Sequence, residues 1–134
     1  MNVIDWTVVI PCIMIVFDLA TGYIAATFMG TVDSKKMRVG IYGKLGELFA
    51  IVLSYFLEFA ISVYGSTAIG VSVSVPFGAG MCAYITFTEI VSVIENIGCM
   101  NPKTGAKLVE ILGINPDKVN LAPKGGDDDA QRHK

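Results

Sequence analysis

The fold class follows from residues 6–29, WTVVIPCIMIVFDLATGYIAATFM, an apolar run of 24 residues with a single charge at Asp18. At about 1.5 Å per residue, a helix of this length crosses a hydrocarbon core of about 30 Å with some tilt. A cleaved signal peptide fits less well, because the run is too long, no Lys or Arg precedes it and no small-residue cleavage site follows it. We therefore predict a first transmembrane helix here.

Two further apolar segments follow, at about residues 44–64 and 76–99. A polar, glycine-containing stretch at 30–43 predicts a short connection between the first two spans. Residues 71–75 alternate Val and Ser, which favours an extended approach, and Pro76 suits the first turn of a new helix. The sequence thus predicts an all-α integral membrane protein with three transmembrane helices.

The C-terminal part of the chain has a different character. Residues 101–113 begin with the helix-start pair Asn-Pro, end in glycine and oppose apolar to charged positions, which predicts a short amphipathic helix. This helix either lies on the membrane surface or is a solvated tail helix. From Pro123 onward the chain is polar and charged, so we predict a disordered tail. We accordingly divide the chain into a transmembrane domain, 1–100, and an amphipathic helix with a charged tail, 101–134.

The composition agrees with a membrane protein and excludes several functions. Hydrophobic residues make up 53% and charged residues 16% of the chain, and the mean hydropathy is +0.60. Ten Lys and Arg face twelve Asp and Glu, a net charge of −2, which leaves no basic face for nucleic acid. The single histidine is His133, and Cys12, Cys82 and Cys99 lack metal-ligand spacing, so we expect free thiols and no metal site. The sequence also lacks a catalytic set or a phosphate-binding loop, which predicts a protein that is not an enzyme and needs no cofactor.

Charge outside the spans predicts the topology. The basic residues at the connection between the first two spans are Lys35, Lys36, Arg38 and Lys44. The connection at 65–75 carries no charge, so the positive-inside rule places the first connection in the cytoplasm. With three spans, the N-terminus lies outside and the C-terminus inside, and Lys103 and Lys107 agree with this placement.

Acidic residues inside the apolar segments mark one face of each predicted helix. They are Asp18, Glu47, Glu58, Glu89 and Glu95. Each costs roughly 2.5–3.5 kcal/mol near the centre of a bilayer, so each should face a partner, the protein interior or water. The polar and small residues that share these faces at helical spacing are Thr21, Gly22, Ala25 and Ala26, then Lys44, Ser54 and Ser62, then Cys82, Thr86, Ser92 and Asn96. A compact bundle with neutral or hydrogen-bonded carboxyls accounts for any one acid, whereas three such faces together favour several copies around an aqueous lumen.

Small residues and one charge pair complete the predicted site. Gly22 and Ala26 are four residues apart on the first span, and Gly43 and Gly46 offer a similar track on the second, which predicts close helix packing between copies. Lys44 and Glu47, one turn apart, are interpreted as anchors at the cytoplasmic end of the second span.

Three patches of the sequence resemble one family. Asp18-Leu19-Ala20-Thr21-Gly22 is similar to the D-x-x-T-G pattern of the toxin secretion/phage lysis holin family. Residues 34–44, SKKMRVGIYGK, and residues 89–96, EIVSVIEN, also resemble this family and lie in the same order. The resemblance covers about residues 5–100.

The resemblance implies a small holin of the bacterial cytoplasmic membrane that forms homo-oligomers and opens lesions. Such lesions would release a cell-wall hydrolase, or a toxin, and trigger lysis. Two other classes stay open from the residues alone. One is a small ion-coupled transporter or channel subunit, with Asp18, Glu58 and Glu89 as proton or cation sites. The other is an accessory membrane protein that acts by helix–helix binding.

Overall fold

The computed structural model describes residues 6–70 and 74–121, which are helical and contain no strand. The elements are α1 (Trp6–Phe28), α2 (Ser34–Tyr64), the π-helical η1 (Gly65–Ile69), α3 (Phe77–Met100), α4 (Pro102–Leu112) and the 3-10 turn η2 (Pro116–Lys118). Three segments are long and apolar enough to cross a membrane: Trp6–Phe28, Ser34–Ala68 and Phe77–Met100. The all-helical class and the three apolar spans are therefore confirmed. Most of the predicted extended stretch at 71–75, and the predicted disordered tail, lie outside the described residues.

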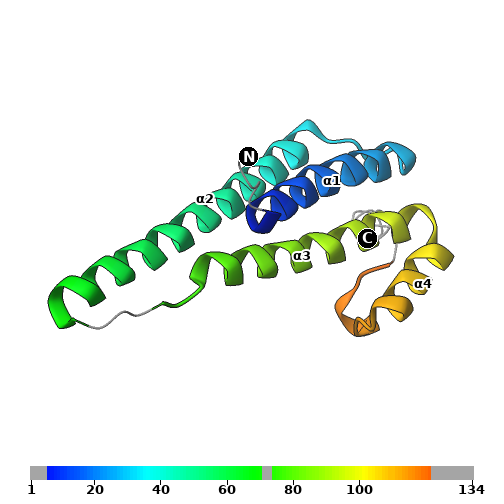
Figure 1. Ribbon diagram of the computed structural model, residues 1–134. Helices are drawn as coiled ribbons and strands as arrows, with labels where there is room; N and C mark the ends of the chain where they lie inside the picture. Colours follow the sequence, from blue (N-terminus) through cyan, green and yellow to red (C-terminus); the bar gives the residue numbers. More distant parts are fainter. Residues whose placement is uncertain (1–5, 71–73, 122–134) are drawn as a thin grey trace, which may run out of the picture.

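Helices α1 and α3 lie side by side, and α2 crosses beside them and extends well past the beginning of α1 (Figure 1). Between the three helices, Ile15, Ile51, Cys82 and Ile85 form a small apolar core. In α1 the buried positions recur every three or four residues, as expected for one face of a helix. One face of each long helix is thus used inside the bundle.

Helix α2 begins ten residues earlier than the sequence predicts, because residues 34–43 are helical rather than a connection. Asp33 caps its first turn, since the Oδ1 atom accepts hydrogen bonds from Lys35 N at 2.7 Å and Lys36 N at 3.4 Å. This cap and the good helix formers that follow outweigh the cost of glycine in a helix, about 1 kcal/mol each. With 31 residues, α2 is about 46 Å long and exceeds the hydrocarbon core. A smaller difference is that Pro76 precedes α3 as its N-cap instead of occupying its first turn.

The outer surface of the three long helices is apolar. Phe49 is 73% exposed, and Val16 and Tyr84 are each 66% exposed, whereas Asp18 and Glu89 are buried. A soluble protein has the opposite distribution, so these outward-facing side chains belong against lipid tails. Within the described residues, Cys12, Cys82 and Cys99 form no disulfide; Cys82 and Cys99 are buried and Cys12 is half-buried.

Helix α4 folds back against the end of α3. Its N-cap is Asn101, whose Oδ1 atom accepts from Thr104 N at 3.2 Å, and Gly113 ends it in the left-handed conformation with φ of 63°. Val109 packs with Ile94 and Val119 in a second apolar cluster, so part of the apolar face of α4 is covered by the protein. The place of α4 relative to the membrane surface, and the domain boundary at residue 100, stay predictions.

Candidate functional site: an ion cluster between the three long helices

Each of the three long helices contributes a charged side chain to one cluster. The ammonium nitrogen of Lys44, on α2, lies 2.9 Å from Asp18 Oδ2 on α1. It also donates to both carboxylate oxygens of Glu89 on α3, at 2.6 and 2.5 Å, and lies 3.5 Å from Glu47 Oε1, one turn away. Glu89 is 1% exposed and Asp18 is 7% exposed. The cluster therefore joins all three spans inside the bundle.

The helical repeat places this cluster directly beside the apolar core. Asp18 follows Ile15 by three residues on α1, and Glu89 follows Ile85 by four on α3. Lys44 precedes Ile51 by two turns on α2, on the same face. Packing of the isoleucines therefore brings the charged residues of the three helices together.

A second layer of hydrogen bonds fixes the carboxylate of Asp18. Asn96 Nδ2 on α3 donates to Asp18 Oδ1 at 3.0 Å and lies 3.2 Å from Thr21 Oγ1. Thr21 Oγ1 donates to the carbonyl oxygen of Asp18 at 3.1 Å. Gly22 leaves room for this amide, since a Cβ atom there would lie 3.4 Å from Asn96 Nδ2. One oxygen of Asp18 thus faces Lys44 and the other faces Asn96.

The cluster contains more acid than base. One ammonium group faces three carboxyl groups, and Glu47 Oε2 is buried with no hydrogen-bond partner. In the three ion pairs of the cluster, the cation is Lys44. Removal of one partner of a buried ion pair costs about 3–5 kcal/mol, because it leaves an uncompensated charge. The arrangement of the three spans therefore depends strongly on this one lysine.

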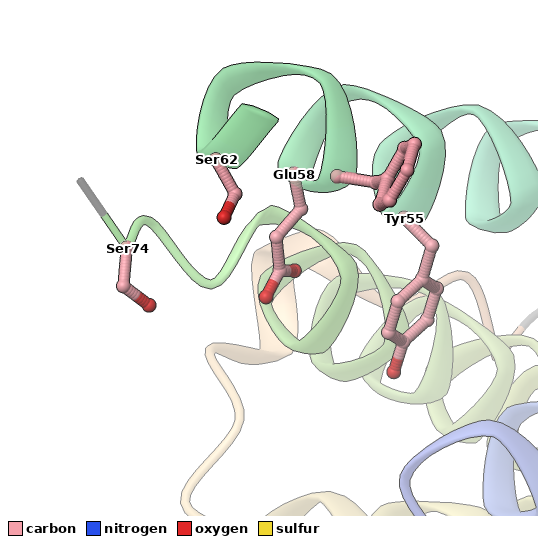
Figure 2. A pocket seen from close by; sticks show the side chains of 5 residues that line it. Tyr55, Glu58, Ser62 and Ser74 are labelled. Atoms are coloured by element: carbon pink, nitrogen blue, oxygen red, sulfur yellow. The ribbon is translucent and has the colours of Figure 1, made fainter. Parts of the chain in front are cut away.

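Glu58 lies apart from the cluster, at the far end of α2. Its Oε2 atom accepts a hydrogen bond of 3.1 Å from Gly78 N and so caps the beginning of α3. Beside Glu58 lies an open pocket of about 310 Å³ lined by Tyr55, Glu58, Phe59, Ser62 and Ser74. Figure 2 shows Glu58 between Tyr55 and Ser62. Because a Cβ atom on Gly78 would lie 2.5 Å from the ring of Tyr55, α2 and α3 approach closely here.

The comparisons with known proteins give one match. The model of the bacteriophage holin family matches residues 1–115. The chain belongs to this family. Comparisons with curated proteins and with solved structures find no match. The matched region contains all three apolar helices and the whole of α4, so the chain is a multi-pass membrane holin. Family membership agrees with the expectation of a non-enzymatic protein and does not favour the transporter or accessory-protein alternatives.

The holin structure brings together only some of the residues that the sequence singled out. Asp18, Thr21, Glu47, Glu89 and Asn96 converge, whereas Glu58 and Glu95 lie elsewhere. Glu95 Oε1 accepts a hydrogen bond of 2.9 Å from Asn120 N, in the segment that follows α4.

Lys44 is the residue whose contacts sequence reasoning missed. Its interpretation as a terminal anchor included the pair with Glu47, which is present but is the longest of its ion pairs. Because α2 begins at Ser34, Lys44 lies in the third turn of the helix and reaches inward. Its position in register with Glu47, Ile51 and Ser54 was the available signal that it faces the bundle.

The predicted packing glycines differ in their surroundings. Gly22 faces Asn96 within the same chain. Gly43 and Gly46 have no atom within 4 Å of an added Cβ atom, so one copy leaves this side of α2 uncovered. Ala26 is half-buried on α1. The roles of these residues in self-association stay predictions.

Proposed function

We propose that this holin accumulates in the cytoplasmic membrane of the host bacterium, self-associates and opens lesions through which a cell-wall hydrolase reaches its substrate. The observation that carries the proposal is the match to the bacteriophage holin family across all three spans. Lysis follows once the hydrolase degrades the wall.

The distribution of polar groups supports lesion formation. The outer faces of the bundle are apolar and suit lipid, whereas the ion cluster provides four charged side chains on three helices. These groups are the ones able to contact water when helices from several copies rearrange, because lipid does not solvate them. The uncovered side of α2 at Gly43 and Gly46 offers a surface on which a second copy can approach closely.

The distribution of charge supports the orientation. Lys35, Lys36 and Arg38 are exposed in the first turns of α2, which exceeds the thickness of the hydrocarbon core. By the positive-inside rule these turns lie at the cytoplasmic surface. The N-terminus is then outside and the C-terminus, with α4, inside.

The test is induction of the full chain alone in a bacterial host, with and without a co-expressed cell-wall hydrolase. We expect the membrane potential to collapse at a defined time in both cultures, and rapid lysis only where the hydrolase is present. An ion-specific flux with viability retained would instead support the transporter class. Accumulation in the membrane with no effect on the potential would support an accessory protein, and either result would refute the proposal.

A further inference from the structure

We propose that the Lys44 cluster is an intramolecular lock that holds α2 against the α1–α3 pair, and that its opening determines when the lesion forms. This inference rests on the proposed lesion-forming function and adds the element that regulates it. The structural basis is that Lys44 contacts Asp18 on α1 and Glu89 on α3 at the same time.

The three helices are attached to one another unequally. Helix α1 buries five residues and α3 buries eight, whereas α2, although longer, buries Ile51 and Ser54. Figure 1 shows α1 and α3 packed side by side while much of α2 extends away from α1. Helix α2 is therefore the element that can separate from the other two.

Lys44 is where the N-terminal half of α2 begins to contact the bundle. Residues 34–43 are all exposed, and Lys44 is the first residue of α2 that is not. Beyond the core residue Ile51, the attachment of α2 continues at Tyr55 and Glu58, which hold its far half to Gly78. Breaking the Lys44 contacts thus lets α2 move away from α1 and α3 as far along as Ile51, while Tyr55 and Glu58 keep its far end joined to α3.

The charged groups of the cluster have different interactions in the closed bundle and in a water-lined lesion. In the closed bundle the ammonium of Lys44 is paired with the carboxyl groups of Asp18 and Glu89 in a buried setting. When water enters, the attraction between them weakens in proportion to the rise in dielectric constant, and each group becomes hydrated. Opening therefore favours further opening, which makes the event abrupt.

Asn96 and Thr21 explain why α1 and α3 stay together. Asn96, on α3, donates to the Asp18 oxygen that Lys44 does not contact and also donates to Thr21 Oγ1, so it bonds to two residues of α1. This layer remains complete when Lys44 leaves. The lock therefore releases one helix rather than unfolding the bundle.

The first test measures the time from induction to collapse of the membrane potential. The variant is Lys44→Gln, and its matched control is Lys36→Gln, which removes the same charge from an exposed position of the same helix. Loss of one partner of a buried pair shifts the closed-to-open equilibrium by roughly 100- to 4,000-fold, so K44Q should collapse the potential earlier and at a lower amount of protein. K36Q should behave as the wild type.

A charge exchange separates the lock from general damage. The double variant Lys44→Glu with Glu89→Lys restores opposite charges on α2 and α3. Its potential should collapse at a time closer to that of the wild type than the time of either single variant. Equal timing of K44Q and K36Q, failure of K44Q to trigger although it accumulates, or purely additive effects in the exchange would each overturn the lock. In all of these cases killing by the wild-type chain would leave the proposed function standing.

The second test uses a thiol and does not depend on variants at Lys44. Cys82 is 2% exposed and lies in the core with Ile51 of α2, so release of α2 uncovers it. In a chain with Cys82 as its one cysteine, a water-soluble thiol reagent should label it only after the potential collapses. Ala25→Cys, also 2% exposed in the wild type but on α1, is the control and should stay protected in a chain with no other cysteine. Labelling of Cys82 before collapse, or protection after it, would overturn the proposal.

Discussion

Asp18 provides the sharpest measure of how much the polar layer stabilises the bundle. Each of its carboxylate oxygens has one partner on another helix, Lys44 Nζ at 2.9 Å and Asn96 Nδ2 at 3.0 Å. Asparagine keeps one acceptor oxygen, so Asp18→Asn loses one of these bonds and the charge. Leucine keeps neither and leaves Lys44 short of a partner.

The expected magnitudes follow from these contacts. A hydrogen bond to a charged group contributes about 1.5–3 kcal/mol, and a neutral bond between membrane helices about 0.6–1.7 kcal/mol. We therefore expect Asp18→Asn to reduce the free energy of unfolding by about 1–3 kcal/mol and Asp18→Leu by about 2–5 kcal/mol. The test is which of the two substitutions destabilises the bundle more. If position 18 faced lipid, the more apolar leucine would be tolerated better than asparagine, which is the opposite of the order expected here.

The assay is unfolding of the purified chain in mixed micelles, followed by loss of helicity, with the time of potential collapse measured in parallel in cells. Thr27→Val is the matched control on the same helix, because Thr27 is exposed and its hydroxyl donates only to Tyr23 O, one turn back. The control should change stability by less than about 0.5 kcal/mol. If Asp18→Leu unfolds like the control and triggers at the wild-type time, the argument from Lys44 and Asn96 is refuted.

Three further predictions concern topology, self-association and the C-terminal segment. A reporter enzyme that is active only outside the membrane, fused after Lys134, should be silent, and an active fusion would overturn the orientation argued from Lys35, Lys36 and Arg38. Gly43→Leu combined with Gly46→Leu should leave the helicity of the chain unchanged but reduce cross-linked oligomers and delay killing, because both positions are open in one copy. The control is Gly40→Leu, which is also open but lies nearer the end of the helix. An unchanged ladder of cross-linked oligomers in the double variant would refute this interface. Gly105→Val should detach α4 from α3, since a Cβ atom at Gly105 would lie 2.6 Å from Gly98 Cα. Limited proteolysis should then cut the segment after α3 faster than in a Lys103→Ala control. Equal rates of cleavage in the two variants would contradict the packing of α4 on α3.

The sequence predicted well those features that depend on one segment at a time. Hydropathy and length located α1 and α3 to within a residue or two, and the Asn101 cap and Gly113 located α4. It failed at the beginning of α2, because the polar residues 34–43 resemble a connection by composition. There the capping carboxylate of Asp33 and the local helix propensity decide the structure rather than hydropathy.

Helical periodicity showed which face of each span is polar, but it carries no information on partners. Asp18 and Asn96 are 78 residues apart and Lys44 and Glu89 are 45 apart, so their pairing depends on how three helices pack. A lysine near the start of an apolar segment is also a usual membrane anchor, since its long side chain can reach the interface. The inward path of Lys44 follows from the ten additional residues of α2, which leave the third turn of the helix inside the bundle.

The charge of the cluster is difficult to explain as a stabilising device alone. Well-packed apolar residues of similar volume often stabilise a buried site as well as an ion pair does, or better, and here Ile15, Ile51 and Ile85 already provide such packing next to the charges. The cluster also includes Glu47, whose buried Oε2 atom has no hydrogen-bond partner, so three carboxyl groups surround a single ammonium group. A bundle selected only for stability would lack this excess acid. A bundle that must first stay closed and later expose a polar face to water requires groups that compensate one another when dry and become favourably hydrated when separated. The arrangement of Lys44 with its three carboxyl groups meets both requirements.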